Sequence, residues 1–185
     1  MAAGAYVKTK KGDPRPPFVA MSRSTLLGLT VSVEYADAAK RAEYLRAIDP
    51  ALGDPFATGP GGRERALTFL IGFANDSKQV AVFQPGNVAL LPDRGDRSFP
   101  LDMTDLYMSA ERAGIKDLQQ VIDRSSRIIF DSSTNIPSGG RVTRLLAFRP
   151  IEGDWRQLQV LFSYIQIGSE THTLSFPFHK ETIGG

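Results

Sequence analysis

The chain has no cysteine and only two histidines among its 185 residues. The absence of cysteine excludes disulfides, cysteine-ligated zinc sites and thiol redox motifs, although it does not fix the compartment. No stretch approaches the roughly 20 consecutive apolar residues of a membrane-spanning helix. The hydrophobic content of 42% and charged content of 23% are globular values, so the chain can bury a core of its own.

Positive charge is also limited. The net charge is +2 and the sequence pI is about 9.0, and part of the excess comes from Lys8, Lys10, Lys11 and Arg15 near the N-terminus. A nucleic-acid-binding protein needs a concentrated basic face. The sequence offers only a basic tail, so we expect no nucleic-acid partner.

The two histidines do not suggest a catalytic or metal site. His172 and His179 are seven positions apart, and an odd separation on one strand places side chains on opposite faces, which excludes a simple metal-binding pair. The chain contains no Gly-x-Ser-x-Gly nucleophile motif. We predict no catalytic residue, no metal and no cofactor; a hydrolase using one histidine with a distant serine and aspartate is the least favoured function.

Residues 1–20 differ in composition from the rest. They are small, basic and proline-rich, as in Lys10-Lys11-Gly12-Asp13-Pro14, and such a segment buries too little apolar surface to offset its ordering entropy. We predict a flexible tether over 1–20 and a single domain over 21–185. A bacterial lipoprotein cleaved just after its lipidated cysteine would carry such a segment. The alternatives are an ordinary cytoplasmic start or a polybasic membrane or nucleic-acid arm.

The stretch 67–91 carries the strongest β-pattern. Apolar runs over 67–74 and 80–83 flank a polar break at 75–79, which predicts an antiparallel hairpin, followed by a turn at 85–87 and a strand over 88–91. Residues 25–35 alternate with a period of two, which predicts one half-buried strand.

Three further strands are predicted near the C-terminus, over 141–149, 157–167 and 171–179. Gly153-Asp154 and Gly168-Ser169 are the expected hairpin turns between them. Both faces of 157–167 are apolar, which indicates a central strand or one covered by a helix. Together the strands predict a mainly β, antiparallel β-sandwich.

Two segments switch to helical spacing. Asp37 is the expected N-cap of a helix over 37–48, which Asp49-Pro50 ends. The second helical segment covers 103–124 and is broken or kinked at Gly114. The connection over 49–66 is rich in glycine and proline, as a functional or merely mobile long loop would be. Residues 97–101 are expected to form a short edge strand or extended piece.

The order of these elements resembles immunoglobulin-like β-sandwiches of bacterial cell-envelope lipoproteins and related secreted proteins. The matching stretches lie within 67–178 and are Phe73-Ala74-Asn75-Asp76-Ser77, Val82-Phe83-Gln84-Pro85-Gly86-Asn87-Val88, Ile136-Pro137-Ser138-Gly139 and Leu145-Leu146-Ala147-Phe148. These are turn formers and core residues, and the two helical segments depart from the plain sandwich. The resemblance implies a non-catalytic binding or scaffolding module and supplies no site residue.

Several short motifs have ordinary structural explanations. Closely spaced Asp93, Asp96, Asp102 and Asp105 could ligate a hard cation, but aspartates also favour turns and helix N-caps, and Asp102 or Thr104 suits an N-cap. Arg94-Gly95-Asp96 matches an adhesion tripeptide and is also good turn chemistry. Asn75-Asp76-Ser77 matches a glycosylation sequon, and a turn explains it more simply. The glycine-rich stretch 59–62 lacks the ending of a phosphate-binding loop.

These observations favour a non-enzymatic cell-envelope lipoprotein that binds another protein and supports assembly of an envelope complex. It would be anchored in the periplasm or outer membrane and would contact the membrane through its N-terminus only. The alternative is a glycan- or lipid-binding module that uses the 49–66 loop or the 103–124 helices as a lid. We name Trp155, Tyr107, Arg63 and Arg65 as candidate partner-binding residues. An exposed tryptophan can anchor a partner, although Trp155 is more simply placed over the end of the core.

Overall fold

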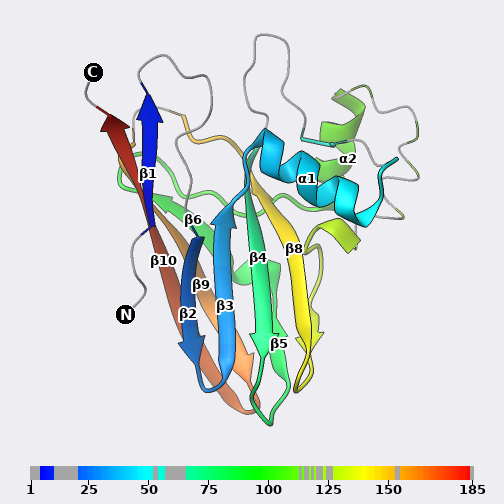
Figure 1. Cartoon of the computed structure of the whole chain (residues 1–185), viewed down its shortest axis with the longest axis vertical. Coiled ribbons are helices and arrows are strands. Elements are labelled where there is room, and N and C mark those ends of the chain that lie inside the picture. The colour runs from blue at the N-terminus through cyan, green and yellow to red at the C-terminus, as the bar shows by residue number, and fades with distance from the viewer. Residues whose placement is uncertain are drawn as a thin grey trace.

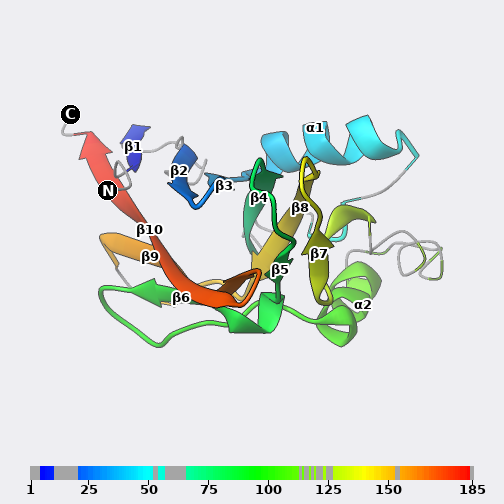
Figure 2. The ribbon, with the colours of Figure 1, turned by 90° about the horizontal axis from the view of Figure 1, so that it is seen from below.

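The computed structural model describes residues 5–10, 21–51, 54–56, 66–112, 127–152 and 155–183, with the single positions 114, 117, 119 and 123. Two β-sheets pack face to face, and helix α1 (Ala38–Ile48) lies across the outer face of one of them (Figure 1, Figure 2). The mainly β class is confirmed, and the arrangement is compatible with the predicted β-sandwich.

The four-stranded sheet has the order β2 (Met21–Leu26), β3 (Leu29–Tyr35), β4 (Leu67–Asn75) and β8 (Arg141–Phe148), all antiparallel. The six-stranded sheet has the order β1 (Ala5–Lys10), β10 (Glu170–Ile183), β9 (Gln157–Ile167), β5 (Ala81–Phe83) and β7 (Thr134–Ile136). Its remaining strand, β6 (Val88–Pro92), follows the short 3₁₀ turn Pro85–Asn87 and also pairs with β9.

The predicted single strand over 25–35 is wrong, because the chain forms a tight hairpin there. Leu27 and Gly28 make the turn, with φ of 49° and 85°, and Leu26 lies opposite Leu29 in the β2–β3 ladder. Glycine adopts positive φ without strain, so Gly28 is the local signal of the turn. Leu27, which extended the alternating pattern by one position, is 55% exposed.

The predicted hairpin over 67–83 is also wrong. Strand β4 pairs with β3 and β8, whereas β5 pairs with β7 and β9, so residues 75–80 cross from one sheet to the other. The expected hairpin between 141–149 and 157–167 fails for the same reason, since β8 and β9 lie in different sheets. Residues 153–154 themselves lie outside the described residues. A strand-turn-strand pattern is equally compatible with a hairpin and with a crossover between sheets.

The β9–β10 hairpin is confirmed, with its turn at Gly168 and Ser169. Its ladder shifts register between His172 and Leu174, because two residues of β9 stand opposite one residue of β10. Such a bulge re-aims the side chains that follow it. Phe162 and Ile165 are therefore both buried although their separation is odd, while Tyr164 is 58% exposed. The prediction of a central strand over 157–167 is confirmed, since β9 lies between β10 and β5, and the bulge explains why buried residues occupy both odd and even positions of β9.

Part of the predicted N-terminal tether belongs to the sheet. Residues 5–10 form β1, which pairs in parallel with the end of β10 from Phe178 to Ile183. Strand β1 lies along the edge of β10 opposite to β9, and its pairing continues past His179, where the pairing of β9 with β10 stops. The rest of the predicted tether lies outside the described residues.

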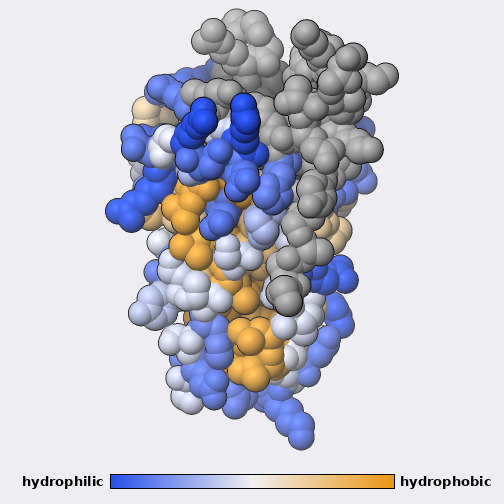
Figure 3. Space-filling model, turned by 90° about the vertical axis from the view of Figure 1, so that its left-hand side faces the viewer, coloured by the Kyte–Doolittle hydropathy of each residue, from blue (hydrophilic) through white to orange (hydrophobic). Residues whose placement is uncertain are grey.

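The main core lies between the two sheets. Phe69 and Phe73 of the four-stranded sheet contact Phe178 and Phe83 of the six-stranded sheet, with ring centroids 5.3 and 4.8 Å apart. Phe73, Phe83, Leu146 and Phe162 are all buried. Hydrophobic residues also reach the surface in a band along the side of the molecule where β2 and β10 form the edges of the sheets (Figure 3).

The helical predictions hold within the described residues. Asp37 caps α1 by accepting a hydrogen bond from the Lys40 amide at 2.8 Å, and Asp49 ends the helix. Helix α2 (Met103–Arg112) is followed by Gly114 at a φ of 75°. Most of 113–124 lies outside the described residues. No described helix is long and apolar enough to cross a membrane.

A buried ion pair fixes the start of the 49–66 connection. The Arg41 side chain on α1 has no exposed surface, and its Nε lies 2.9 Å from Asp54 Oδ2. Its remaining donors reach Thr68 Oγ1 at 3.0 Å and the Phe56 carbonyl at 3.1 Å. Because buried charges are costly unless paired and hydrogen-bonded, this network joins α1, β4 and residues 54–56 into one unit.

Candidate functional site

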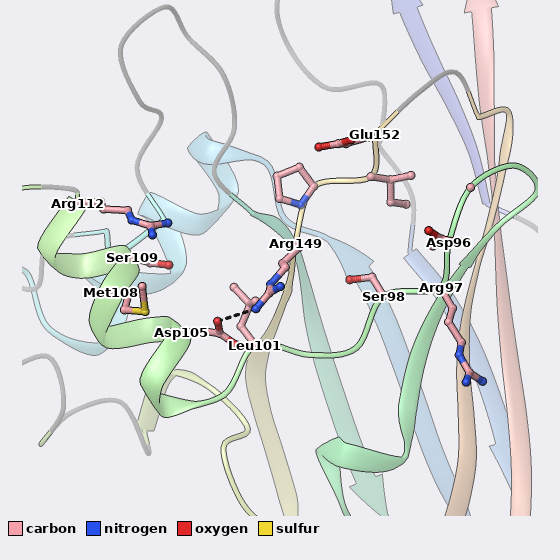
Figure 4. A pocket seen from close by; sticks show the side chains of 13 residues that line it. Asp96, Arg97, Ser98, Leu101, Asp105, Met108, Ser109, Arg112, Arg149 and Glu152 are labelled. Carbon is pink, nitrogen blue, oxygen red and sulfur yellow. Dashed lines mark hydrogen bonds and ion pairs between the residues drawn. The ribbon is translucent and has the colours of Figure 1, made fainter.

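An open groove of about 920 Å³ lies at one end of the two sheets. Residues 95–98 form one wall, one side of α2 forms the other, and residues 149–152 lie between them with Leu101 (Figure 4). We call this the α2 groove. It brings together three stretches of chain that are far apart in the sequence.

Helix α2 presents a defined side to the groove. Asp102 Oδ1 accepts the Asp105 amide at 2.9 Å, and Asp105 Oδ2 accepts the Asp102 amide at 3.4 Å, so the two form a reciprocal N-terminal cap. Leu106 and Ala110 are buried in the smaller core cluster. Helical spacing then turns the opposite side toward the groove, namely Asp105, Met108, Ser109 and Arg112. The predicted N-cap at Asp102 is confirmed.

The opposite wall is an extended segment held to both sheets. Ser98 exchanges backbone hydrogen bonds of 2.8 and 2.9 Å with Leu90 of β6, and the Leu101 amide donates to Ala147 of β8 at 2.7 Å. The extended piece expected over 97–101 is therefore confirmed. Because it bridges the two sheets, its position relative to α2 is fixed by backbone pairing.

Asp93 holds the chain just before this wall. Its Oδ1 accepts the amides of Arg156 and Gln157 at 2.9 and 3.1 Å, and its own amide donates to the Gln157 carbonyl. These backbone hydrogen bonds lower the pKa of Asp93 below its usual value, because they favour the charged carboxylate. Asp93 was predicted to lie in a turn, and in the structure its hydrogen bonds also join the end of β6 to the start of β9.

The charges that line the groove balance. Its lining includes the arginines Arg97, Arg112 and Arg149 and the carboxylates Asp96, Asp105 and Glu152. Arg149 Nη2 lies 3.1 Å from Asp105 Oδ1, an ion pair that joins the end of β8 to α2 (Figure 4). Arg97 points away from this pair (Figure 4) and lies over the Phe99 ring, 5.3 Å from its centroid.

The predicted partner-binding residues do not gather at one place. Tyr107 lies on α2 and is 40% exposed, beside the groove-facing Met108 at 42%. Trp155 is 7% exposed and belongs to the main core, the placement favoured from the sequence over an exposed anchor. Arg63 and Arg65 lie outside the described residues. Sequence reasoning missed Met108, Arg112 and Arg149; the helical spacing of Asp105, Met108 and Arg112 was the available signal.

The remaining motifs have structural roles where they are described. Asn75 is fully buried, and its Nδ2 donates to the carbonyls of Gln79 and Ile136, both at 2.8 Å. Its Oδ1 accepts the Ser77 hydroxyl and amide. A side chain held in this way is not accessible to a glycosylating enzyme. The glycine-rich stretch 59–62 lies outside the described residues.

The histidines lie on opposite faces of β10. His172 Nε2 lies 3.5 Å from Glu170 Oε2. The His172 side chain is largely buried, whereas that of Glu170 is exposed. No group of three or more His, Asp or Glu residues in the described ranges is arranged to hold a metal ion.

Tyr44 joins α1 to the chain beneath it. Its hydroxyl, a single O–H donor, lies 3.2 Å from each of the carbonyl oxygens of Ile128 and Thr143. Burial raises the pKa of Tyr44 to about 12, against an opposing effect of the nearby Arg144 charge. The tyrosine is therefore neutral over the working pH range and acts as a hydrogen-bond donor between elements.

Comparison with known proteins gives no family. No protein-family model and no curated protein matches the chain. Among solved structures, the chain is similar to the yjhA protein from Bacillus subtilis, with 12% sequence identity and a TM-score of 0.39. That similarity covers 82% of this chain and 78% of the yjhA chain.

Proposed function

We propose that the protein is a non-enzymatic binding module that holds an extended segment of another protein in the α2 groove. The groove itself is the observation that supports this proposal. It is an open trough whose lining is mostly charged or hydroxylated, with Leu101, Met108 and Ile151 as apolar contacts. A polypeptide offers the amides, charges and small apolar side chains that such a lining can pair.

The polar lining also argues against the lipid alternative. Sites for small apolar ligands are mostly enclosed and apolar, with few polar groups. Here arginines and carboxylates stand on both sides of the trough. Buried against a lipid, these charges would lose water without gaining partners, which is unfavourable. This argument is weaker against a glycan, whose hydroxyl groups can hydrogen-bond to the charged lining. The experiment below distinguishes a glycan from a polypeptide.

Charge pairing would set the specificity of the groove. Arg112 has no ion-pair partner among the described residues, and Arg149 shares Asp105 while 75% of its side chain is exposed. Both guanidinium groups can therefore donate hydrogen bonds to a carboxylate of the bound segment. Asp96 and Glu152, on the other side, suit a basic side chain.

The cell-envelope setting is a further part of the proposal. It is supported by the basic, proline-rich composition of residues 11–20, which follow β1, and by the resemblance to immunoglobulin-like envelope lipoproteins. In this setting the protein would be lipid-anchored through its N-terminus, in the periplasm or outer membrane, and would help to hold an envelope complex together.

Site-specific photocrosslinking in source cells tests the groove. A photoreactive amino acid at Met108 should give a protein adduct that the same group at exposed Thr25, on the outer face of the four-stranded sheet, does not give. The partner identified by mass spectrometry is then titrated in purified form. We expect Arg112→Glu and Arg149→Glu to weaken it by about tenfold or more, with Arg23→Glu as the matched control outside the groove.

Two results would contradict the proposal. One is an adduct pattern at Met108 no different from that at Thr25. The other is a purified partner whose affinity changes equally with Arg23→Glu and Arg112→Glu, because the groove would then contribute nothing specific. A thermal shift with oligosaccharides, lost in the two groove variants, would instead support the glycan alternative.

A further inference from the structure

The outer face of the six-stranded sheet carries no charge over most of its extent. Strands β5, β6, β7 and β9 and the stretch 171–178 of β10 contain no Asp, Glu, Lys or Arg, although 23% of the chain is charged. The outer face of the four-stranded sheet differs, since it carries Arg23, Glu34 and Arg141 on its strands. Figure 2 shows that α1 covers that other sheet and that no described helix crosses the six-stranded one.

Strand register defines the residues of this uncharged face. One row across the sheet is Thr171, Gln166 and Val82, and another is Ser175, Leu161 and Ala89. Val82, Gln166, Leu161 and Ala89 each lie between two buried core residues, so they point outward, and Thr171 and Ser175 pair with Gln166 and Leu161; Ala89 itself is only 8% exposed. The face is thus made of hydroxyls, amides and small apolar groups.

Two large aromatic side chains also lie on this face. Tyr164 is turned outward by the β9 bulge and is 58% exposed, and Phe99, next to β6, is 51% exposed with the Arg97 guanidinium over its ring. Ser98 pairs with Leu90, which is in the core, so the neighbouring Phe99 points to the outer side. Aromatic residues are enriched and charged residues depleted at the centres of protein interfaces, which is the composition seen here.

We propose that this uncharged face is the contact between two copies of the chain, joined face to face about a two-fold axis. An isologous contact places the same patch on both partners. Apart from Arg97 beside Phe99, the face meets itself without like-charge repulsion, whereas a charged partner would have charges desolvated and unpaired against it. The proposal goes beyond the α2 groove, because α2 and residues 149–152 lie off this face and only the 95–98 wall adjoins it, next to Phe99.

The size of the face is sufficient for such a contact. Strand β9 has 11 residues, which span about 36 Å, and three to four strands at about 4.8 Å give a width of about 14–19 Å. The face therefore offers roughly 500–700 Å² per copy, or roughly 1,000–1,400 Å² in total. This reaches the lower range of specific interfaces, so we expect a dimer that dissociates in the micromolar range.

Sedimentation equilibrium on the intact protein tests the proposal. The wild type should dimerise with a Kd between about 1 and 100 µM. Tyr164→Asp and Phe99→Asp should each raise the Kd by about tenfold or more, because each change enters a symmetric contact twice. The matched control is Met21→Asp, which alters a 52% exposed hydrophobic residue on β2 of the other sheet and should leave the Kd unchanged.

A second measurement uses the absence of cysteine from the chain. Ser175→Cys on the face should give a covalent dimer with a short bismaleimide, whereas Thr25→Cys on the other sheet should not. A wild type that stays monomeric up to about 300 µM would overturn the proposal. So would a dimer that resists Tyr164→Asp and Phe99→Asp, or that crosslinks equally at both cysteines.

Discussion

Replacing Asp54 by alanine should destabilise the protein far more than its place beside a long loop suggests. The change removes the counter-charge of Arg41, whose side chain has no exposed surface, while Asp54 itself is 17% exposed. The guanidinium would then lose this carboxylate and keep neutral acceptors, which include Thr68 Oγ1 and the carbonyls of Phe56 and Ala36.

The expected loss of unfolding free energy is about 2–4 kcal/mol. Breaking a buried ion pair by removing one partner typically costs about 3–5 kcal/mol, because a charge is left uncompensated in a poorly solvated place. We place the value slightly lower for two reasons. The partial exposure of Asp54 lets water approach, and the neutral acceptors retain part of the stabilisation of Arg41.

A second ion pair of similar length but high exposure serves as a control for the effect of burial. Asp76 pairs with Arg141 at 3.2 Å, close to the 2.9 Å of the Asp54 pair, but the two side chains are 63% and 69% exposed. Asp76→Ala should therefore cost only about 0–1 kcal/mol. Urea unfolding with linear extrapolation measures both variants. Raising the salt to about 1 M should remove the effect of Asp76→Ala and leave most of the effect of Asp54→Ala.

A double-mutant cycle completes the test. Arg41→Met removes the charge that Asp54 neutralises, so the double variant should lose less stability than the sum of the two single variants, by about 1 kcal/mol or more. The reasoning is refuted if Asp54→Ala costs less than about 0.5 kcal/mol, the usual range for surface changes. Strict additivity of the two single variants would refute it as well.

Three further outcomes are expected. Phe83 contacts the rings of Phe73 and Phe130 at 4.8 and 4.9 Å between centroids, so Phe83→Ala should cost about 3–5 kcal/mol in urea unfolding; a loss below about 1 kcal/mol would be inconsistent with its place in the core. Asn75→Ala orphans the buried carbonyls that its Nδ2 satisfies and should cost about 2–4 kcal/mol, whereas an unchanged urea midpoint would show that water replaces the amide. The lowered pKa of Asp93 means that its stabilising effect is present above the unfolded-state pKa of about 3.9 and is lost as the pH falls through the lower folded-state pKa. The Tm of wild type should thus exceed that of Asp93→Asn at pH 6 and converge with it in strong acid, and a difference independent of pH would contradict this assignment.

Local sequence determined where many elements begin and end. Asp37 predicts the start of α1 because its side chain caps an amide three residues away. Gly168 and Ser169 predict the β9–β10 turn, and alternation identifies most strand residues that face the core. In each case the interacting residues lie within a few sequence positions of one another, so the sequence pattern predicts the element without knowledge of the fold.

Tertiary structure alone decided which strands pair. The apolar runs of β4 and β5 read as a hairpin, yet they belong to opposite sheets, and the side chain of Asn75 donates to the Gln79 carbonyl within the crossover and to the Ile136 carbonyl at the end of β7. The α2 groove likewise joins residues near positions 96, 108 and 150. Alternation of apolar and polar residues predicts which face of a strand is buried, but it does not predict which strand lies beside it. Partner choice depends on packing between distant segments, and that is where both the groove and the uncharged face arise.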